Sequence, residues 1–180
     1  MPALPADILT FWLNAGPEKW FSRKAAFDDA IRLKFEPTHY AAARGEYSAW
    51  ENTAEGCAAL LILLDQFPRN LYRGTAHMFA TDPLARRIAR KALDREFDKA
   101  VDPLLRQFFY LPFAHSEDPA DQERAVALYS AAMDPDGLKW AVLHEDIIAR
   151  FGRFPHRNVA LGRVMTPEEQ AFLDDGGFAG

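Results

Sequence analysis

The sequence predicts an all-α fold of eight or nine helices in antiparallel pairs. Apolar residues recur at helical spacing along most of the chain. Aspartate-proline pairs, a common helix start, occur repeatedly. No alternating polar and apolar run is bounded by hairpin-turn residues, so strands are not expected. Because the connectors are short, neighbouring helices are expected to be antiparallel.

Length and composition predict a single helical domain over residues 1–180, with a loose tail at about 176–180. The chain has 180 residues, of which 49% are hydrophobic, enough for one ample core. The predicted helical segments are residues 5–13, 25–35, 38–43, 52–67, 83–97, 104–113, 120–133, 138–151 and 166–173.

In the first half of the chain, helix faces and helix stops define the elements. Asn14-Ala15-Gly16-Pro17 stops the first helix. Phe27, Ile31 and Phe35 share one face of the second helix. Pro37 is expected to interrupt that helix before a short continuation.

The central stretch 57–64 is apolar on every side, so its helix must be buried all round. Asn52 is the expected N-cap, with Glu55 completing a capping box. Pro68 is expected to end the helix. Asp65 then lies in the last turn, where the helix dipole disfavours a negative charge, so it needs a cation or several donors.

In the second half, start signals define the elements. Asp82 is the expected N-cap of a helix whose first residue is Pro83, and Asp102-Pro103 and Asp118-Pro119 repeat the pattern. Asp134-Pro135-Asp136-Gly137 is interpreted as a turn or a further cap. Thr166, followed by Pro167 and Glu169, forms a capping box that starts the last helix.

The charge balance excludes several classes of protein. A net charge of −5 argues against broad nucleic-acid binding. One cysteine, in the apolar helix, excludes an intramolecular disulfide and a cysteine metal cluster. No basic-then-apolar leader and no apolar run of membrane-spanning length are found, so a cytoplasmic location and no membrane partner are expected.

Basic residues are nevertheless concentrated in two stretches. Between Gln66 and Leu93 the only acid is Asp82, and residues 147–167 contain none. If the two stretches meet in space, they form a positive concavity on an acidic protein. The alternative is that basic helices pack beside acidic ones.

The leading hypothesis is a binding module with an arginine-lined pocket for an anionic small molecule or a peptide carboxylate. The arginine guanidinium matches a carboxylate or phosphate in geometry. The motifs Gln66-Phe-Pro-Arg-Asn70 and Arg153-Phe-Pro-His-Arg-Asn158 echo each other and supply the donors. The predicted ligand-binding residues are Asp65, Arg69, Asn70, Arg73, His115, Arg153, His156, Arg157 and Asn158.

Two alternatives remain open. One is an enzyme, such as a hydrolase, in which Asp65 and a histidine such as His115 or His156 activate water. The other is an interaction scaffold whose polar motifs are structural ion pairs. No phosphate loop, dinucleotide fingerprint or two-histidine zinc helix is present, so no cofactor or metal is expected. The sequence does not determine the oligomeric state.

Three ordered blocks carry a resemblance. They are LLDQFPRNLYRGTAHMFATDPLA (63–85), FFYLPFAHSEDPADQERAVAL (108–128) and HEDIIARFGRFPHRNVALGR (144–163), followed by TPEEQAFL (166–173). Together they resemble the bacterial domain of unknown function 924 family over almost the whole chain. The resemblance implies a tetratricopeptide-like helical fold and supplies no catalytic residues.

Overall fold

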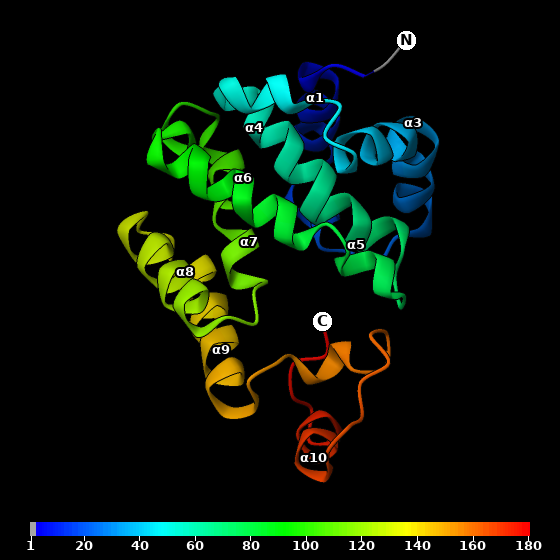
Figure 1. Ribbon diagram of the computed structural model, residues 1–180, viewed down its shortest axis with the longest axis vertical. Helices are drawn as coiled ribbons and strands as arrows, with labels where there is room; N and C mark the ends of the chain where they lie inside the picture. Colours follow the sequence, from blue (N-terminus) through cyan, green and yellow to red (C-terminus); the bar gives the residue numbers. More distant parts are fainter. Residues whose placement is uncertain (1–2) are drawn as a thin grey trace. The chain divides into compact units, whose positions relative to one another are not determined.

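The computed structural model describes residues 3–180, and the described chain is helical without a strand, which confirms the all-α prediction (Figure 1). Backbone contacts divide it into two compact units. The N-terminal unit comprises residues 3–73 and 77–112, and the C-terminal unit residues 74–76 and 113–180. The single domain and the tetratricopeptide-like pairing of helices stay predictions.

The first part of the chain is built around one continuous helical path, residues 54–71. Its α-helices are α1 (Pro5–Ala15), α2 (Pro17–Trp20), α3 (Ala25–Ala43), α4 (Ala54–Leu61), α5 (Phe67–Leu71) and α6 (Asp82–Asp94). Shorter helical turns are η1 (Ser48–Asn52), the π-helical turn η2 (Ile62–Gln66), η3 (Ala76–Phe79), η4 (Phe97–Lys99) and η5 (Pro103–Phe109).

The second part is simpler. After α7 (Leu111–Ala114), the helices α8 (Pro119–Ala131) and α9 (Pro135–Phe151) pack against each other (Figure 1). The 3₁₀ turn η6 (Pro155–Arg157) and helix α10 (Pro167–Asp174) complete the C-terminal unit. None of the helices described is both long and apolar enough to span a bilayer.

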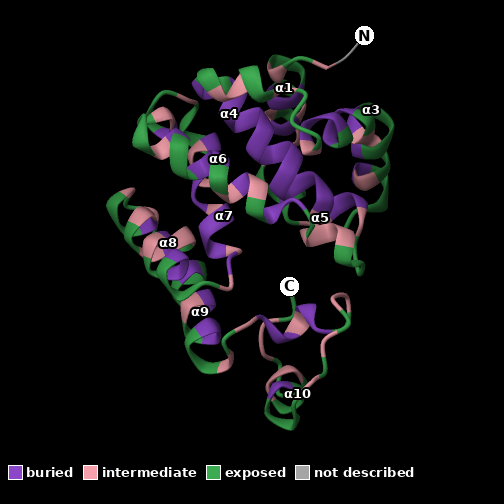
Figure 2. Ribbon diagram, in the orientation of Figure 1, coloured by how far each residue is buried: buried purple, intermediate pink, exposed green. Residues whose placement is uncertain are grey.

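The core of the N-terminal unit confirms the prediction for the apolar stretch 57–64, because every residue in it is buried (Figure 2). Phe67 follows on the same helical path and is fully buried. Its ring centroid lies 5.5 Å from those of both Trp12 and Phe35. Contacts of this kind between large rings contribute beyond the area that they bury.

The expected effect of two prolines was wrong. Pro37 lies inside α3, which continues to Ala43. Pro68 does not end the central helix either, because α4 passes through the π turn η2 directly into α5. The proline is the second residue of α5, so its missing N–H leaves a carbonyl of η2 without the usual helical donor.

Side chains satisfy the carbonyl groups that the π turn and the proline release. Phe67 N–H bonds to Ile62 O, five residues back, so Leu63 O is free to accept from His39 Nδ1 at 2.8 Å. Pro68 has no N–H for Leu64 O, which accepts instead from Thr81 Oγ1 at 2.5 Å. The helix therefore continues without orphaned acceptors at these positions.

Replacing Thr81 by valine removes the hydroxyl that donates to Leu64 O from a buried site. We expect the free energy of unfolding to fall by about 1–3 kcal/mol, because Leu64 O loses its donor. In a Pro68→Ala background, the new N–H can bond Leu64 O, so the same substitution should cost less. Urea denaturation of the four proteins measures this coupling. Equal costs in both backgrounds would contradict the account.

The start signals were confirmed at most positions. The side chains of Asp102, Asp118, Asp134 and Thr166 each accept a backbone N–H at a helix start. Two predicted caps were one residue out of place: Thr53 rather than Asn52 caps α4, and Thr81 rather than Asp82 precedes α6. Residues 104–113, predicted as one helix, are divided between η5 and α7.

Candidate functional site

The predicted site residues fall into two groups. Asp65, Arg69, Asn70 and Arg73 belong to the N-terminal unit. His115, Arg153, His156, Arg157 and Asn158 belong to the C-terminal unit.

Asp65 and Arg69 form a buried ion-pair network with Asp82, which we call the buried triad. Arg69 Nη1 lies 3.2 Å from Asp65 Oδ1 and also donates to the Asp65 carbonyl. The same guanidinium binds both carboxylate oxygens of Asp82 at 3.0 Å. Burial alone would lower the pKa of Arg69, but the two carboxylates outweigh it and raise that pKa. The triad therefore ties α5 to the start of α6.

The remaining donors of this motif bind another carboxylate, that of Asp28 on α3. Asn70 Nδ2 donates to Asp28 Oδ1 at 2.7 Å. Arg73 donates to both oxygens of Asp28, at 3.0 and 3.2 Å, and to the backbone of Ser22. These bonds join α5 to α3. A ligand-binding role for this group stays a prediction, and so does the hypothesis that Asp65 acts as a base.

In the C-terminal unit, Glu169 binds two of the predicted residues. Arg153 contacts both oxygens of Glu169, at 2.5 and 2.8 Å, and Asn158 Nδ2 donates to it at 3.1 Å. The same carboxylate accepts the Thr166 backbone N–H in the predicted capping box. The hydrogen bond from Arg153, with those of Thr166 and Asn158, lowers the pKa of Glu169 to about 2.

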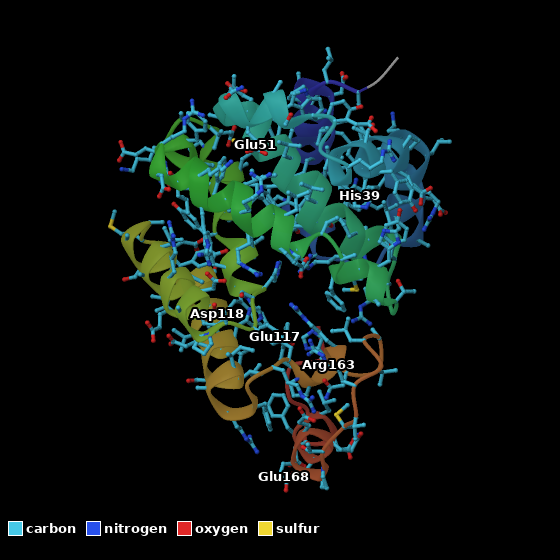
Figure 3. All side chains as sticks on the ribbon, viewed as in Figure 1. His39, Glu51, Glu117, Asp118, Arg163 and Glu168 are labelled. Carbon is cyan, nitrogen blue, oxygen red and sulfur yellow. The ribbon has the colours of Figure 1, made fainter. Side chains whose placement is uncertain are left out.

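A second carboxylate, Glu117, was not predicted as a site residue. Arg163 binds its two oxygens at 2.8 and 2.7 Å, and the Phe154 backbone N–H donates to it at 2.9 Å (Figure 3). Burial would raise the pKa of Glu117, but Arg163, the Phe154 amide and the charge of Arg157 lower it. Glu117 thus fixes the segment that carries Phe154, His156 and Arg157.

Three histidines and Arg157 form what we call the His/Arg cluster: His115, His144, His156 and Arg157. The guanidinium of Arg157 lies 4.5 Å from the centre of the Phe154 ring, and the residue is only 6% exposed. The ring centroids of His115 and His144 are 6.5 Å apart. His144 Nδ1 donates to the Ala114 carbonyl at 3.0 Å, which fixes its ring.

Burial holds His156 neutral, and the basic groups around it add to this effect. Burial, then the neighbouring Arg157, His144 and His115, lower its pKa from 6.5 to about 3, and Glu117 opposes them only in part. Three of these four groups are basic, and the fourth is bound by Arg163. Arg157 thus brings a guanidinium beside the imidazole of His156, and His144 and His115 lie nearby, a grouping that the sequence motifs alone did not show.

This shift predicts a dependence of stability on pH. Between pH 6.5 and 3 the unfolded chain protonates His156 while the folded chain does not, so stability falls as the pH falls. At pH 5 the loss from this one group is about 2 kcal/mol relative to pH 7. Replacing His156 by glutamine should therefore flatten the profile measured by urea denaturation. Parallel profiles for the two proteins would refute the assignment.

The sequence predicted the donors of the two motifs but not the carboxylates that bind them. Asp28, Asp82, Glu117 and Glu169 hold the predicted donors, and His144 joins the cluster. One signal was available, because Asp82 is the only acid in a strongly basic stretch. Among residues 3–180, no group of three histidine, cysteine, aspartate or glutamate side chains is placed to hold a metal ion.

The fold and these clusters define an all-helical protein whose arginine motifs are ordered by internal carboxylates. The chain belongs to the family of bacterial proteins of unknown function DUF924, whose profile matches residues 8–177. It is similar to the solved structure of a protein of unknown function from Agrobacterium tumefaciens, with 53% identity and a TM-score of 0.93. That match covers 96% of this chain and 97% of the other. Comparison with curated proteins finds no match.

Proposed function

We propose that the protein is a binding module that takes a small anionic ligand at the His/Arg cluster of the C-terminal unit. The observation that carries this proposal is the environment of His156. The buried guanidinium of Arg157 lies against the Phe154 ring in this cluster, and Arg157, His144 and His115 all lower the pKa of His156, whereas Glu117, which opposes them, binds Arg163. An anion such as a carboxylate or phosphate complements this arrangement.

The contacts of the other predicted arginines support the choice of the His/Arg cluster as the anion site. Arg69, Arg73 and Arg153 each bind an internal carboxylate through two or more contacts. A ligand at those positions would have to displace a carboxylate that the fold already supplies.

The proposal is tested by calorimetric titration with sodium phosphate and with sodium citrate at constant ionic strength. Replacing Arg157 by glutamine removes a charged donor, so we expect affinity to fall roughly 10- to 100-fold. Arg150→Gln is the matched control, because Arg150 also stacks on an aromatic ring of this unit. The Arg150→Gln variant should bind phosphate and citrate with the same affinity as the unmodified chain.

Nuclear magnetic resonance of His156 gives a second readout. A bound anion stabilises the imidazolium, so the pKa of His156 should rise from its low value on saturation. Absence of saturable binding, or equal affinity in both arginine variants, would refute an anion site here.

The buried triad and the bonds to Asp28 favour a second candidate, an interaction scaffold whose polar motifs are structural. In such a protein the arginine motifs fix helix packing, and an exposed surface binds the partner. This candidate predicts that Arg157→Gln alters stability and leaves no anion affinity to lose. The same titration therefore separates the two candidates.

A further inference from the structure

The exposed side of α6 carries a row of basic side chains. The helix packs on α4, and its buried apolar residues are Ala85, Ile88, Ala89 and Ala92. Arg87 and Lys91 lie on the exposed side, and Arg95 follows directly after the helix at the same spacing of four residues. Because four residues of a helix rise about 6 Å, the three side chains form a row about 12 Å long. We call Arg87, Lys91 and Arg95 the α6 basic row.

Among residues 3–180, this row forms ion pairs with one carboxylate, that of Glu51 on η1 (Figure 3). Arg87 binds its two oxygens at 2.7 and 3.1 Å, and the Lys91 ammonium lies 3.5 Å from it. The hydrogen bond from Arg87, together with the charges of Arg87 and Lys91, outweighs partial burial and lowers the pKa of Glu51. Glu51 therefore stays ionised and contributes a single negative charge to the row.

The third cation of the row, Arg95, has neutral partners. Its guanidinium donates to Glu51 O at 3.2 Å and to Asn52 O at 3.3 Å, and it lies 4.2 Å from the centre of the Phe97 ring. Carbonyl groups and an aromatic ring orient a cation without cancelling its charge. Three cations against the one carboxylate therefore leave the row with two excess positive charges.

The rest of this helix face keeps the same sign. Between residues 83 and 95, Arg86 and Arg90 add two positive charges and Asp94 adds one negative charge. A surface hollow is lined by Pro83 and four cations: Arg86, Arg87, Arg90 and Lys91. The exposed large apolar side chains of the described chain all lie outside α6, so this face offers little apolar surface for insertion into a bilayer. A hydrophilic anionic partner is the occupant that these charges complement.

We infer that the α6 basic row binds an acidic segment of a partner protein whose carboxylates repeat once per helical turn. Glutamates four residues apart on a helix repeat about every 6 Å, which matches the row. Arg87 uses two of its five N–H donors on Glu51, and Lys91 makes a single contact, so both keep donors for an incoming carboxylate. Glu51 also holds these two side chains in place, which reduces the loss of side-chain entropy on binding. The inference goes beyond the anion site proposed above, because the row belongs to the N-terminal unit.

The probe is a fluorescein-labelled peptide of four Glu-Ala-Ala-Gln repeats with an amidated end, and fluorescence anisotropy at low ionic strength measures its binding to the full chain. Exposed ion pairs are individually weak, so Arg87→Gln, Lys91→Gln and Arg95→Gln are combined in one variant. We expect this variant to bind the probe roughly tenfold or more weakly than the unmodified chain does. The same peptide with glutamine in place of each glutamate should lose affinity for the unmodified chain to a similar extent.

The matched control changes the net charge by the same amount at exposed cations of the same unit that each bind a carboxylate of their own. It combines Arg32→Gln, Arg44→Gln and Lys99→Gln. The control should keep the probe affinity within about twofold, because its cations are already balanced one to one.

A single substitution covers the case in which the triple row variant does not fold, as judged by circular dichroism. Lys91→Glu reverses a charge whose ammonium makes one contact at 3.5 Å and whose side chain is 63% exposed. It should weaken probe binding roughly threefold or more, because the new carboxylate repels those of the peptide.

Loss of probe affinity in the row variant, with affinity kept in the control, supports the inference. Equal losses in the two triple variants would show a response to net charge alone and overturn it, and so would an unchanged affinity in Lys91→Glu. A single-stranded oligonucleotide of the same charge that binds more tightly than the peptide, with the same dependence on the row, overturns the assignment to an acidic protein segment. The phosphate titration at the His/Arg cluster is a separate measurement on Arg157, so either proposal can fail while the other stands.

Discussion

Replacing Arg69 by alanine should lower the free energy of unfolding by about 3–5 kcal/mol, because it removes the guanidinium that binds two buried carboxylates. Asp65 is 1% exposed and Asp82 is 6% exposed, so water cannot easily replace the guanidinium. For a chain of this length the melting temperature should drop by roughly 6–20 °C. Urea denaturation followed by circular dichroism measures the change.

Arg87→Ala is the matched control for this prediction. Arg87 also binds a carboxylate through two bonds, to Glu51 at 2.7 and 3.1 Å, but its side chain is 45% exposed. Exposed pairs contribute at most about 1 kcal/mol. A cost for Arg69→Ala no larger than that for Arg87→Ala would show that the buried triad does not hold α5 to α6.

The buried triad also illustrates what the sequence could predict. Asp65 was expected to need a cation because of its burial and its place in a helix, and Arg69 supplies it. The expectation that Pro68 would end the helix between these residues was wrong, since the helical path continues through η2. The spacing of four residues therefore survives. Thr81 makes this possible, and its contact with Leu64 spans 17 residues that no local pattern relates.

Helix starts were predictable because their signals are local. An aspartate or threonine before a proline fixes the first turn through bonds that span two or three residues. The carboxylate partners were not predictable, since Arg73 and Asp28 are 45 residues apart, and Arg163 and Glu117 are 46 apart. Any of the chain's 26 acids could satisfy an arginine on sequence grounds, and only the packing selects one.

The candidate site shows the same division. His156 and Arg157 were predicted from their motif, and their contribution depends on His144 and Glu117, which lie on other elements. The shift of the His156 pKa comes first from burial, a property of the tertiary structure. Phe178 was predicted to lie in a loose tail. Its ring contacts His144 and His156, and no sequence pattern indicated these contacts.

Replacing Phe67 by alanine should cost about 3–5 kcal/mol, the range for removing a fully buried phenylalanine. Its ring is inaccessible to solvent and packs on Trp12 and Phe35. Phe67→Leu keeps most of the apolar volume and should cost less than half as much. Phe21→Ala is the control, because that ring is 61% exposed and its loss should change stability by only about 0.5 kcal/mol.

The double variant Phe67→Ala with Arg69→Ala tests how α5 is held. Both residues lie on this five-residue helix, Phe67 packing on aromatic rings and Arg69 binding the two aspartates. If the two contacts hold α5 as one unit, its attachment can be lost only once. The double variant should then cost less than the sum of the single costs, by an amount within the range of about 0.5–3 kcal/mol found for coupled neighbours. Strict additivity would show that the aromatic and the ionic contacts stabilise α5 independently.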